Sequence, residues 1–462
     1  MKTQLDLQFD ARSVLVTPSK RQLAWQETEF YAFIHFSVNT FTNREWGDGT
    51  EPPSCFAPTR LDPAQWARCI RDAGMKGAIL TCKHHDGFCL WPSRYTDHTV
   101  AASPCPRDVV REFSEACRRY GLKFGVYLSP WDRHSALYGT GKPYDDYFVN
   151  QLRELLTNYG PVFSVWLDGA CGEGPCGKRQ SYDWERYYAV VRELQPDACI
   201  SVCGPDVRWC GNEAGYTRKS EWSVVPRRTR DTEKIQEKSQ TGDTAEFRQR
   251  KISAGDEDLG SRDAVRDEPD LVWYPAEVNT SIRPGWFYHP AEDGQVKPLE
   301  ELIRIYESSV GGNASFLLNI PPTPEGLIHE NDAARLRELG AYLRETYRRD
   351  LAEEARITRT EDTVHLLWPE PVTVSRIVLM EDIAQSQRVE AFAVYDGGGT
   401  ELYSGTVIGY KKIVPLESCV TDRLTIRILS SRQEPRLIFT GVYCVPILPP
   451  VNGHVLHTFP HK

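Results

Sequence analysis

The chain of 462 residues has no long hydrophobic run. No stretch approaches the ~18 consecutive apolar residues that predict a membrane-spanning helix. The segment 1–10 also lacks the uninterrupted apolar core of a secretory signal peptide. We therefore expect no membrane partner and a cytoplasmic protein, or a secreted or periplasmic one if a leader was removed.

A surplus of basic residues is also missing. The 55 Lys and Arg residues are outnumbered by 64 Asp and Glu residues, which gives a net charge of −9. The basic side chains are dispersed except for a short cluster near Arg227. Because nucleic-acid binding depends on concentrated positive charge that neutralises phosphates, the sequence argues against a nucleic-acid partner.

Paired Cys-x-x-Cys elements with zinc spacing are absent, although the chain contains 13 cysteines. An odd number leaves at least one thiol free, and reduced thiols are the simpler interpretation. Two groups invite a metal interpretation: Cys199, Cys203 and Cys210, and the run Cys171–Cys176. Their spacing does not match a zinc motif, so we expect neither a metal nor another cofactor.

As far as about residue 347, the sequence alternates apolar, strand-like runs with amphipathic, helix-like segments. The expected helices cover 62–73, 107–120, 147–159, 183–194, 299–310 and 333–347. The expected strands cover 31–34, 77–80, 124–126, 162–167, 199–202, 222–226, 271–274 and 315–319. This period is typical of βα units, and it predicts a (β/α)8-like catalytic barrel over residues 1–347.

Four of the first strands end in polar residues. His35, the run Lys83–Asp86, Tyr127 and Asp168 each follow an apolar run directly or within three residues. In a barrel of parallel strands, the carboxyl ends of the strands face the loops that build the active site. These side chains are therefore predicted to converge.

Two later segments depart from this pattern. The charged segment 227–270 shows little apolar periodicity, so it is either a solvated insertion or a loop over the site. Residues 348–462 consist of short alternating runs separated by turns and without helices, which predicts a C-terminal β-sandwich. Lectin-like modules share that architecture, but a structural buttress for the barrel is the favoured interpretation.

The converging residues allow two kinds of chemistry. His35, His84, His85 and Asp168 could hold a metal in a hydrolase, although adjacent strand residues such as His84 and His85 point to opposite faces. Alternatively, neutral imidazoles and carboxylates could bind sugar hydroxyls, beside aromatic rings that supply an apolar wall. Tryptophans occur near these loops at Trp46, Trp131, Trp273 and Trp286.

Hydrolysis of a glycoside requires two carboxyl groups, one ionised and one able to hold a proton near neutrality. Asp168 is the first candidate. The second should lie on another strand end or loop, and Glu213 shortly after the fifth strand meets this requirement. On position alone the competitors are Glu45, Glu173, Glu221 and Glu277.

Several motifs in the barrel resemble the α-L-fucosidases of glycoside hydrolase family 29. They follow one another in the order Phe33–Ser37, Thr40–Gly47, Lys83–Phe88, Gly125–Arg133 and Val165–Ala170. The motifs Gly211–Glu213 and Ser281–Phe287 further resemble the branch of the family that prefers α-1,3/4-linked fucose on Lewis-type glycans. The resemblance covers the barrel and agrees with a C-terminal β-sandwich.

The resemblance implies a retaining glycoside hydrolase that acts on fucosylated glycans and has possible transfucosylation activity. Asp168 matches the nucleophile and Glu213 the acid/base of the α-1,3/4 branch. Arg208 is expected to support the acid/base side. The residues expected to bind the sugar are His35, Glu45, Trp46, His84, His85, Tyr127, Trp131 and Trp286.

Two other functions stay open at this point. A metal-dependent hydrolase would lose its activity in the presence of a chelator, whereas a fucosidase would not. A sugar-binding protein without catalysis would bind its ligand but not turn it over. The presence of both Asp168 and Glu213 argues against the second of these.

Overall fold

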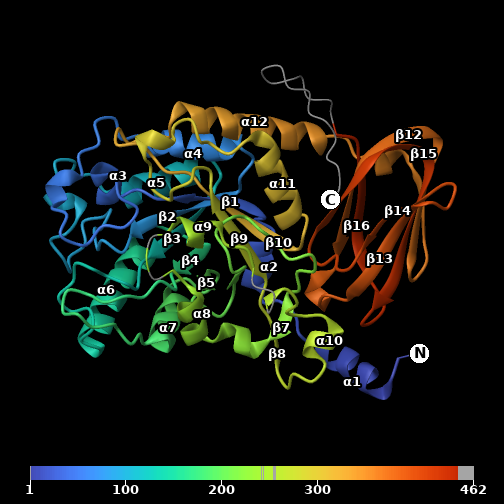
Figure 1. Ribbon diagram of the computed structural model, residues 1–462, viewed down its shortest axis with the longest axis horizontal. Coiled ribbons are helices and arrows are strands. Elements are labelled where there is room, and N and C mark those ends of the chain that lie inside the picture. The colour runs from blue at the N-terminus through green and yellow to red at the C-terminus, as the bar shows by residue number, and fades with distance from the viewer. Residues whose placement is uncertain (1, 241, 243, 253–255, 446–462) are drawn as a thin grey trace.

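The computed structural model describes residues 2–240, 242, 244–252 and 256–445. Its chain forms a barrel followed by an antiparallel β-rich region, which lies beside the barrel (Figure 1). The predicted fold class is therefore confirmed. Among the described residues, no helix combines the length and the apolar character needed to cross a membrane.

Eight parallel strands form the barrel sheet. They are β1 (Phe30–Ile34), β2 (Gly77–Lys83), β3 (Lys123–Leu128), β4 (Ser164–Leu167), β5 (Cys199–Val202), β6 (Arg208–Trp209), β9 (Ala276–Ser281) and β10 (Ala314–Asn319). The strand order is β5-β4-β3-β2-β1-β10-β9-β6. A parallel bridge between Ser201 and Val207 brings the two ends of the sheet together, so the barrel is nearly closed.

The six predicted helices are present, with small differences at their ends. They are α4 (Pro63–Asp72), α5 (Val109–Arg119), α6 (Lys142–Asn158), α7 (Trp184–Leu194), α11 (Leu299–Ser309) and α12 (Glu330–Thr346). Helix α4 shows how residues in the sequence define the two ends of such a helix. The Asp62 side chain accepts a hydrogen bond from the backbone N–H of Gln65, and Pro63 occupies the first turn. Gly74, with a φ of +83°, follows the end of this helix.

Three further helices lie early in the chain: α1 (Gln4–Ser13), α2 (Lys20–Gln26) and α3 (Val38–Thr42). Helix α2 contacts the barrel near its closure. The Gln22 side-chain amide donates to the carbonyl oxygens of Asp206 at 2.8 Å and of Trp273 at 3.0 Å. Helix α2 therefore packs on the part of the barrel where β5 and β6 meet.

The predicted sixth and seventh barrel strands are wrong. The runs at 222–226 and 271–274 form β7 (Val224–Pro226) and β8 (Leu271–Trp273), which pair with each other in a separate antiparallel ribbon. The barrel uses β6 and β9 instead. Strand β6 has two residues, and β9 alternates small or apolar residues with the polar Glu277, Asn279 and Ser281. A strand with polar residues on its inner face has no continuous apolar run.

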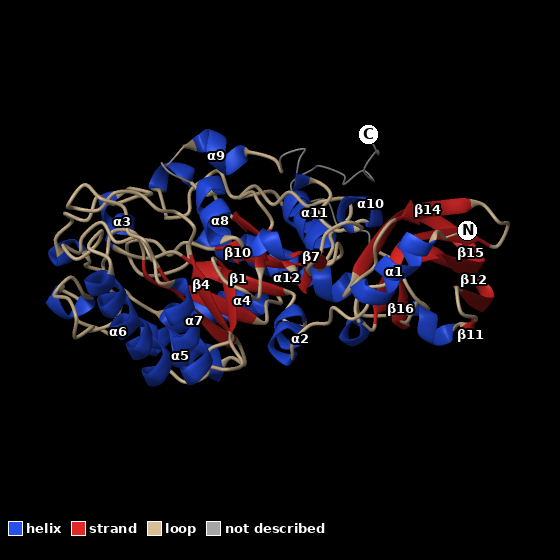
Figure 2. Ribbon diagram, turned by 90° about the horizontal axis from the view of Figure 1, so that it is seen from below, coloured by secondary structure: helices blue, strands red, loops and turns tan. Residues whose placement is uncertain are grey.

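The charged segment 227–270 folds partly into short helices. They are α8 (Thr232–Lys238), α9 (Ala245–Gln249) and α10 (Arg262–Val265). In Figure 2, α8 and α9 lie on one side of the barrel, with α9 outermost. Because Ser239 and Gln240 reach the pocket described below, the segment is a loop over the site and not a purely solvated insertion.

The C-terminal region is an antiparallel sheet with its own core. Its strands are β11 (Arg356–Arg359), β12 (Thr363–Glu381), β13 (Val389–Asp396), β14 (Glu401–Gly405), β15 (Lys412–Ser431) and β16 (Leu437–Tyr443). The long strands β12 and β15 pair along most of their length, with register shifts. The domain predicted for 348–462 extends past these strands, and residues 446–462 lie outside the described residues.

The β-rich region contacts the barrel close to the amino ends of its strands. The Arg376 guanidinium donates to Glu307 of α11 at 2.8 Å. The carboxylate of Glu29, the residue before β1, binds the ammonium of Lys411 and accepts from the Tyr410 hydroxyl at 2.9 Å. The catalytic pocket of a barrel lies at the opposite ends of the strands, so these contacts agree with the buttress interpretation.

Candidate active site

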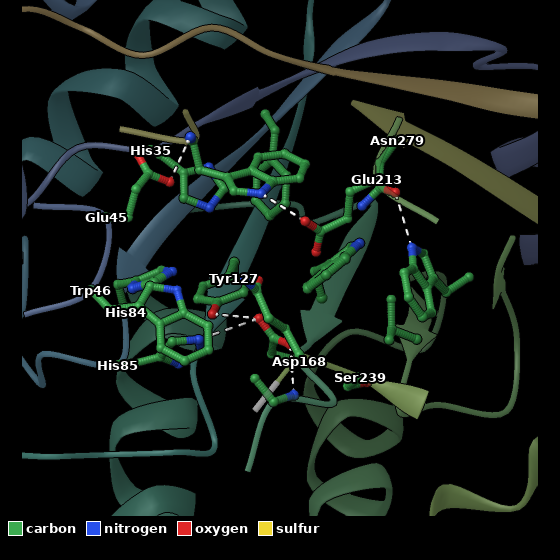
Figure 3. A pocket seen from close by; sticks show the side chains of 17 residues that line it. His35, Glu45, Trp46, His84, His85, Tyr127, Asp168, Glu213, Ser239 and Asn279 are labelled. Atoms are coloured by element: carbon green, nitrogen blue, oxygen red, sulfur yellow. Dashed lines mark hydrogen bonds and ion pairs between the residues drawn. The ribbon is translucent and has the colours of Figure 1, made fainter. Parts of the chain in front are cut away.

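One pocket lies at the carboxyl ends of the barrel strands (Figure 3). It gathers residues from β1 to β5, from β6 and β9, and from the loops after them. Its lining consists of Phe33, His35, Glu45, Trp46, His84, His85, Tyr127, Trp166, Asp168, Ala170, Val202, Trp209, Glu213, Ser239, Gln240, Asn279 and Trp286. Nine of the eleven residues predicted for the site are among them.

Asp168 follows β4 and points into the pocket. Its Oδ2 accepts a hydrogen bond from the Tyr127 hydroxyl at 2.9 Å, and its Oδ1 accepts from the backbone N–H of Ala170 at 2.8 Å. His85 Nε2 lies 3.8 Å from Oδ2. Two donors therefore stabilise the negative charge of a side chain that is still 21% exposed, as a nucleophilic carboxylate requires.

The imidazole of His35 has a fixed hydrogen-bonding direction. The Asn319 amide nitrogen donates to Ser281 Oγ at 2.9 Å and to the carbonyl oxygen of Trp286 at 2.8 Å, so the amide oxygen faces His35. His35 Nδ1 therefore donates to Asn319 Oδ1, at 2.8 Å. Burial lowers the pKa of His35 to about 4. The neutral ring leaves Nε2 as an acceptor for a hydroxyl group.

His85 is held in the same way by a different partner. Ser129 Oγ donates to the carbonyl oxygen of Trp131 at 2.6 Å, so it accepts from His85 Nδ1 at 2.7 Å. Burial lowers the pKa of His85 to about 4 although Asp168 opposes the shift. Nε2 of this neutral ring is again an acceptor, next to the carboxylate of Asp168.

His84 lies between these two rings. Its centroid is 5.4 Å from that of His35 and 4.1 Å from that of His85, and its ring is stacked on Tyr127. Burial, and then the two neighbouring histidines, hold its pKa well below the usual range. Nδ1 of His84 is buried and has no hydrogen-bond partner among the described residues, which is unusual for a buried polar atom.

Glu45 and Trp46 come from the loop after β1. The Glu45 carboxylate accepts from the backbone N–H groups of Trp286 at 2.8 Å and Phe287 at 3.0 Å, and His289 Nε2 lies 2.7 Å away. The Trp46 ring stands at 86° to the ring of His85, with 5.3 Å between the centroids. Glu45 thus ties the loop after β9 to the loop after β1.

Glu213 lies across the pocket from the histidines, on the loop after β6. Its Oε2 accepts a hydrogen bond from Trp286 Nε1 at 3.1 Å. Burial raises the pKa of Glu213 to about 7, and the negative charge of Asp168 adds to the shift while Trp286 opposes it. A carboxyl group with this pKa can hold and release a proton near neutrality, as a general acid must.

The competing glutamates are engaged elsewhere. Glu277 lies inside the barrel and accepts from Trp166 Nε1 at 2.7 Å and from the Tyr31 hydroxyl. Glu221 is buried between Arg208 and Arg218. Glu173 is exposed, and Glu45 is occupied by the contacts given above. The arrangement thus favours Glu213 as the partner of Asp168.

Comparison with known proteins identifies the family. A family model described as Alpha-L-fucosidase matches residues 16–347. The chain belongs to the alpha-L-fucosidase family. The α-L-fucosidase 1 of Arabidopsis thaliana is 35% identical over 471 residues, which cover 93% of this chain and 88% of the relative. Membership makes the protein a glycoside hydrolase that acts on α-L-fucosides.

Two solved structures of the family have the same fold. A glycoside hydrolase 29 family member from a rumen bacterium superposes with a TM-score of 0.82 at 38% identity, covering 95% of this chain and 79% of that one. A Ruminococcus gnavus GH29 fucosidase in complex with fucose has a TM-score of 0.79 at 27% identity, covering 93% of this chain and 95% of that one. The similarity therefore includes both the barrel and the β-rich region.

In this fucosidase family member, two predicted substrate-binding residues do not line the pocket. Trp131 packs behind His85, with 5.0 Å between the ring centroids, and its Nε1 donates to the carbonyl oxygen of Glu173 at 3.1 Å. Arg208 is buried and faces a neighbouring cavity. Trp131 therefore supports the fucosidase pocket from outside.

Six polar or aromatic residues of the fucosidase pocket were not among the predicted site residues. Phe33 and Trp166 lie on β1 and β4. Asn279 and Trp209 lie on β9 and β6 and are joined by a hydrogen bond of 3.0 Å from Trp209 Nε1 to Asn279 Oδ1. Ser239 and Gln240 follow α8. The period-two polar pattern of β9 could have indicated Asn279, but nothing in the charged segment distinguishes Ser239 or Gln240 from solvated residues.

The metal interpretation gains no support from the geometry. Within the parts of the chain that the structure describes, no three His, Cys, Asp or Glu side chains are placed to hold a metal ion together. His35 and His85 direct one ring nitrogen each to Asn319 and Ser129. All 13 cysteines are free thiols, and Cys199, Cys203 and Cys210 are buried.

Proposed function

We propose that this fucosidase is a retaining exo-enzyme that releases terminal L-fucose, α-1,3/4-linked on Lewis-type glycans. The observation that carries the proposal is the pairing of two different carboxyl groups in one pocket. Asp168 is stabilised as an anion by Tyr127 and Ala170, while burial raises the pKa of Glu213 to about 7. This is the division of roles that a double displacement needs.

In the first step an Asp168 oxygen attacks the anomeric carbon of fucose. The bond between that carbon and the glycosidic oxygen breaks, and Glu213 gives its proton to the departing oxygen. The product is a fucosyl ester of Asp168 with inverted configuration. Tyr127 donates to the same carboxylate, so it holds the nucleophile in place as its charge is lost.

In the second step Glu213, now ionised, removes a proton from a water molecule. The water attacks the anomeric carbon and the ester bond to Asp168 breaks, which restores the α configuration. A sugar hydroxyl in place of water would give transfucosylation by the same route. The raised pKa of Glu213 suits both directions of proton transfer near neutral pH.

Recognition of fucose depends on the wall of the pocket that lies across from Glu213. The Nε2 atoms of His35 and His85 are acceptors, so each can accept a hydrogen bond from a hydroxyl group. The Trp286 ring borders the pocket, where we place the C5 methyl group of the sugar. A methyl contact alone discriminates by about 1–3 kcal/mol, so the histidines must supply the rest of the specificity.

Two observations support the choice of sugar and linkage. The Ruminococcus gnavus relative is seen in complex with fucose, and this chain shares its fold. The motifs Gly211–Glu213 and Ser281–Phe287, which resemble the α-1,3/4 branch, supply Glu213 and Trp286 to the pocket.

The proposal is tested by following the hydrolysis of an aryl α-L-fucoside by NMR. We expect α-L-fucose to appear before mutarotation, and β-fucose as the first product would contradict the retaining mechanism.

The linkage preference is tested by comparing kcat/KM for a Lewis x trisaccharide, an α-1,2-linked fucoside and an α-1,6-linked fucoside. Equal values for the three would contradict the α-1,3/4 preference.

A further inference from the structure

A second cavity, with a volume of about 280 Å³, lies next to the active-site pocket. Trp209 and Val202 border both spaces, so they form a shared wall. Gly211 also lines the second cavity and stands two residues before Glu213. The cavity therefore lies on the side of the pocket where Glu213 is found.

That side is where the leaving group must lie. The acid/base protonates the oxygen that joins fucose to the rest of the glycan, so the sugars beyond this oxygen extend past the acid/base. A cavity beside Glu213 is within reach of those sugars, whereas the histidine wall faces the fucose itself. The second cavity is thus placed to contact the leaving group.

The cavity is lined mainly by basic residues. Its lining contains seven Lys or Arg residues and two Asp residues. Five of the seven basic side chains are paired with carboxylates: Arg208 and Arg218 with Glu221, Arg228 with Glu268, Lys234 with Asp231, and Lys238 with Asp256. The excess of positive charge nevertheless contrasts with the acidic balance of the whole chain, which has a net charge of −9.

Arg208 carries N–H donors that are not paired within the described residues. The residue is 5% exposed, and its Nη2 donates to Glu221 at 2.5 Å and to the carbonyl oxygen of Trp222 at 3.3 Å. Its Nε and Nη1 are buried without a hydrogen-bond partner among the described residues. Leaving buried donors unpaired is costly, and Arg208 lines the cavity, so a ligand oxygen that reaches these two atoms would satisfy them.

Arg250 adds a second donor of this kind. Its Nη2 donates to the carbonyl oxygen of Lys238 at 2.6 Å, and its guanidinium lies 3.9 Å from the centroid of the Phe247 ring. Nε of Arg250 is buried and has no partner within the described part of the chain. Two guanidinium groups with spare N–H donors match the oxygens of a carboxylate or a sulfate, which accept several charge-assisted hydrogen bonds.

We propose that this cavity binds an anionic group, a carboxylate or a sulfate ester, carried by the glycan beyond the fucose residue. The inference rests on the proposed function, because it assigns the anion to the leaving group of that reaction. A neutral hydroxyl could also accept from Arg208 or Arg250, but it would gain nothing from the surplus of positive charge. The enzyme should therefore favour anionic over neutral fucosylated glycans.

The test compares three substrates with wild-type protein: the Lewis x trisaccharide, its form with a sulfate on the galactose, and its form with a carboxylated sugar on the galactose. We expect kcat/KM for at least one anionic form to exceed that of the neutral form about tenfold, as for one added charge-assisted hydrogen bond. The advantage should shrink as ionic strength rises. Equal or lower values for both anionic forms would overturn the inference, and the better of the two identifies the anion.

Variants then locate the effect. Arg208→Lys keeps a positive charge for Glu221 but removes the spare Nε and Nη1 donors, and Arg250→Gln removes the second guanidinium. Each should reduce the anionic-to-neutral ratio of kcat/KM severalfold. The matched control is Arg227→Gln, because Arg227 is an exposed residue of the same segment, pairs with Asp270 and does not line the cavity. A ratio that is unchanged in both cavity variants, or reduced as strongly in the control, would contradict the assignment.

Inhibition by the leaving group alone gives a second readout. The sulfated or carboxylated product without fucose should inhibit hydrolysis of an aryl α-L-fucoside about tenfold more strongly than the neutral product, and Arg208→Lys should remove the difference. The aryl fucoside separates the two proposals. Failure to hydrolyse any fucoside would refute the proposed function, whereas hydrolysis without discrimination between anionic and neutral forms would refute only the anion site.

Discussion

The two walls of the active-site pocket are built differently. The wall that carries Asp168 consists of strand ends, where Tyr127 on β3 fixes Asp168 after β4 and Asn319 on β10 fixes His35 after β1. The wall that carries Glu213 consists of loops around the two-residue strand β6. There the side-chain oxygen of Asn212 accepts from the backbone N–H groups of Ala214 and Tyr216, at 3.1 and 3.0 Å.

This difference separates two tasks. Regular strands hold the proposed nucleophile and the imidazoles proposed to bind fucose within small tolerances, because the sugar is the same in every substrate. Loops hold the proposed acid/base, whose surroundings must fit the changing leaving group. Trp286 connects the two walls, since its backbone N–H binds Glu45 and its indole N–H binds Glu213.

The largest effect is expected on the strand-built wall. Asp168→Gly removes the nucleophile, and kcat/KM for an aryl α-L-fucoside should fall on the order of 10⁴-fold or more. Added azide should restore turnover and give β-fucosyl azide, because the small anion attacks from the vacated face. Glu213→Gly with azide should instead give the α-azide, since Asp168 still forms the ester. The same azide anomer from both variants would refute the separate roles.

A large but leaving-group-dependent effect is expected on the loop-built wall. Glu213→Gln removes the general acid, and kcat/KM for a Lewis x trisaccharide should fall about 10²–10⁴-fold. An aryl fucoside whose leaving group is an acidic phenol needs little protonation. Formation of the fucosyl ester from this substrate should therefore slow much less. Glu173→Gln is the control, because Glu173 is exposed and lies on the loop after β4. A loss of equal size for both substrates would argue against an acid role for Glu213.

The strand-built wall is also the part that the sequence predicts. Asp168 and His35 could be found because each directly follows a buried strand, and Tyr127 because it lies near the end of one. The apolar runs of these strands are visible in the sequence. The wall around Glu213 gives no such signal. Strand β6 is too short to form a pattern, and the inner face of β9 carries Glu277 and Asn279 in place of apolar residues.

The wrong predictions of the sixth and seventh barrel strands also arose because the apolar pattern of a segment does not define its place in the fold. The apolar runs now in β7 and β8 have the composition of barrel strands, yet they pair with each other and pack on the C-terminal region, where Val224 and Trp273 contact Ile383. Local hydrophobicity does not say which core a strand joins, because that depends on contacts between residues far apart in the chain. Family motifs, not periodicity, were needed to choose Glu213 over its competitors.

A moderate effect is expected from the hydrogen bond between Tyr127 and Asp168. Tyr127→Phe removes a donor to a charged acceptor, so kcat/KM for an aryl α-L-fucoside should fall about 10–100-fold while the fold is retained. Tyr187→Phe is the matched control, because this tyrosine also donates to a carboxylate, Asp145, but lies outside the pocket. Circular dichroism checks the fold of both variants. A loss in the control as large as that in Tyr127→Phe would show that stability, and not the nucleophile, is affected.

The smallest effect is expected from Trp286, which connects the two walls. It should appear in the pH dependence of kcat/KM. Burial raises the pKa of Glu213 to about 7, so activity should fall above this pH as the acid loses its proton. The indole N–H of Trp286 donates to Glu213 and favours the ionised form. Trp286→Phe should therefore raise the pKa of Glu213 and move the alkaline limb of kcat/KM to higher pH, by about one pH unit or less.

The control is Trp209→Phe. This variant loses an indole N–H that binds Asn279 and not Glu213, so its alkaline limb should not move. A downward shift in Trp286→Phe, or equal shifts in both variants, would mean that the indole of Trp286 does not set the acidity of Glu213.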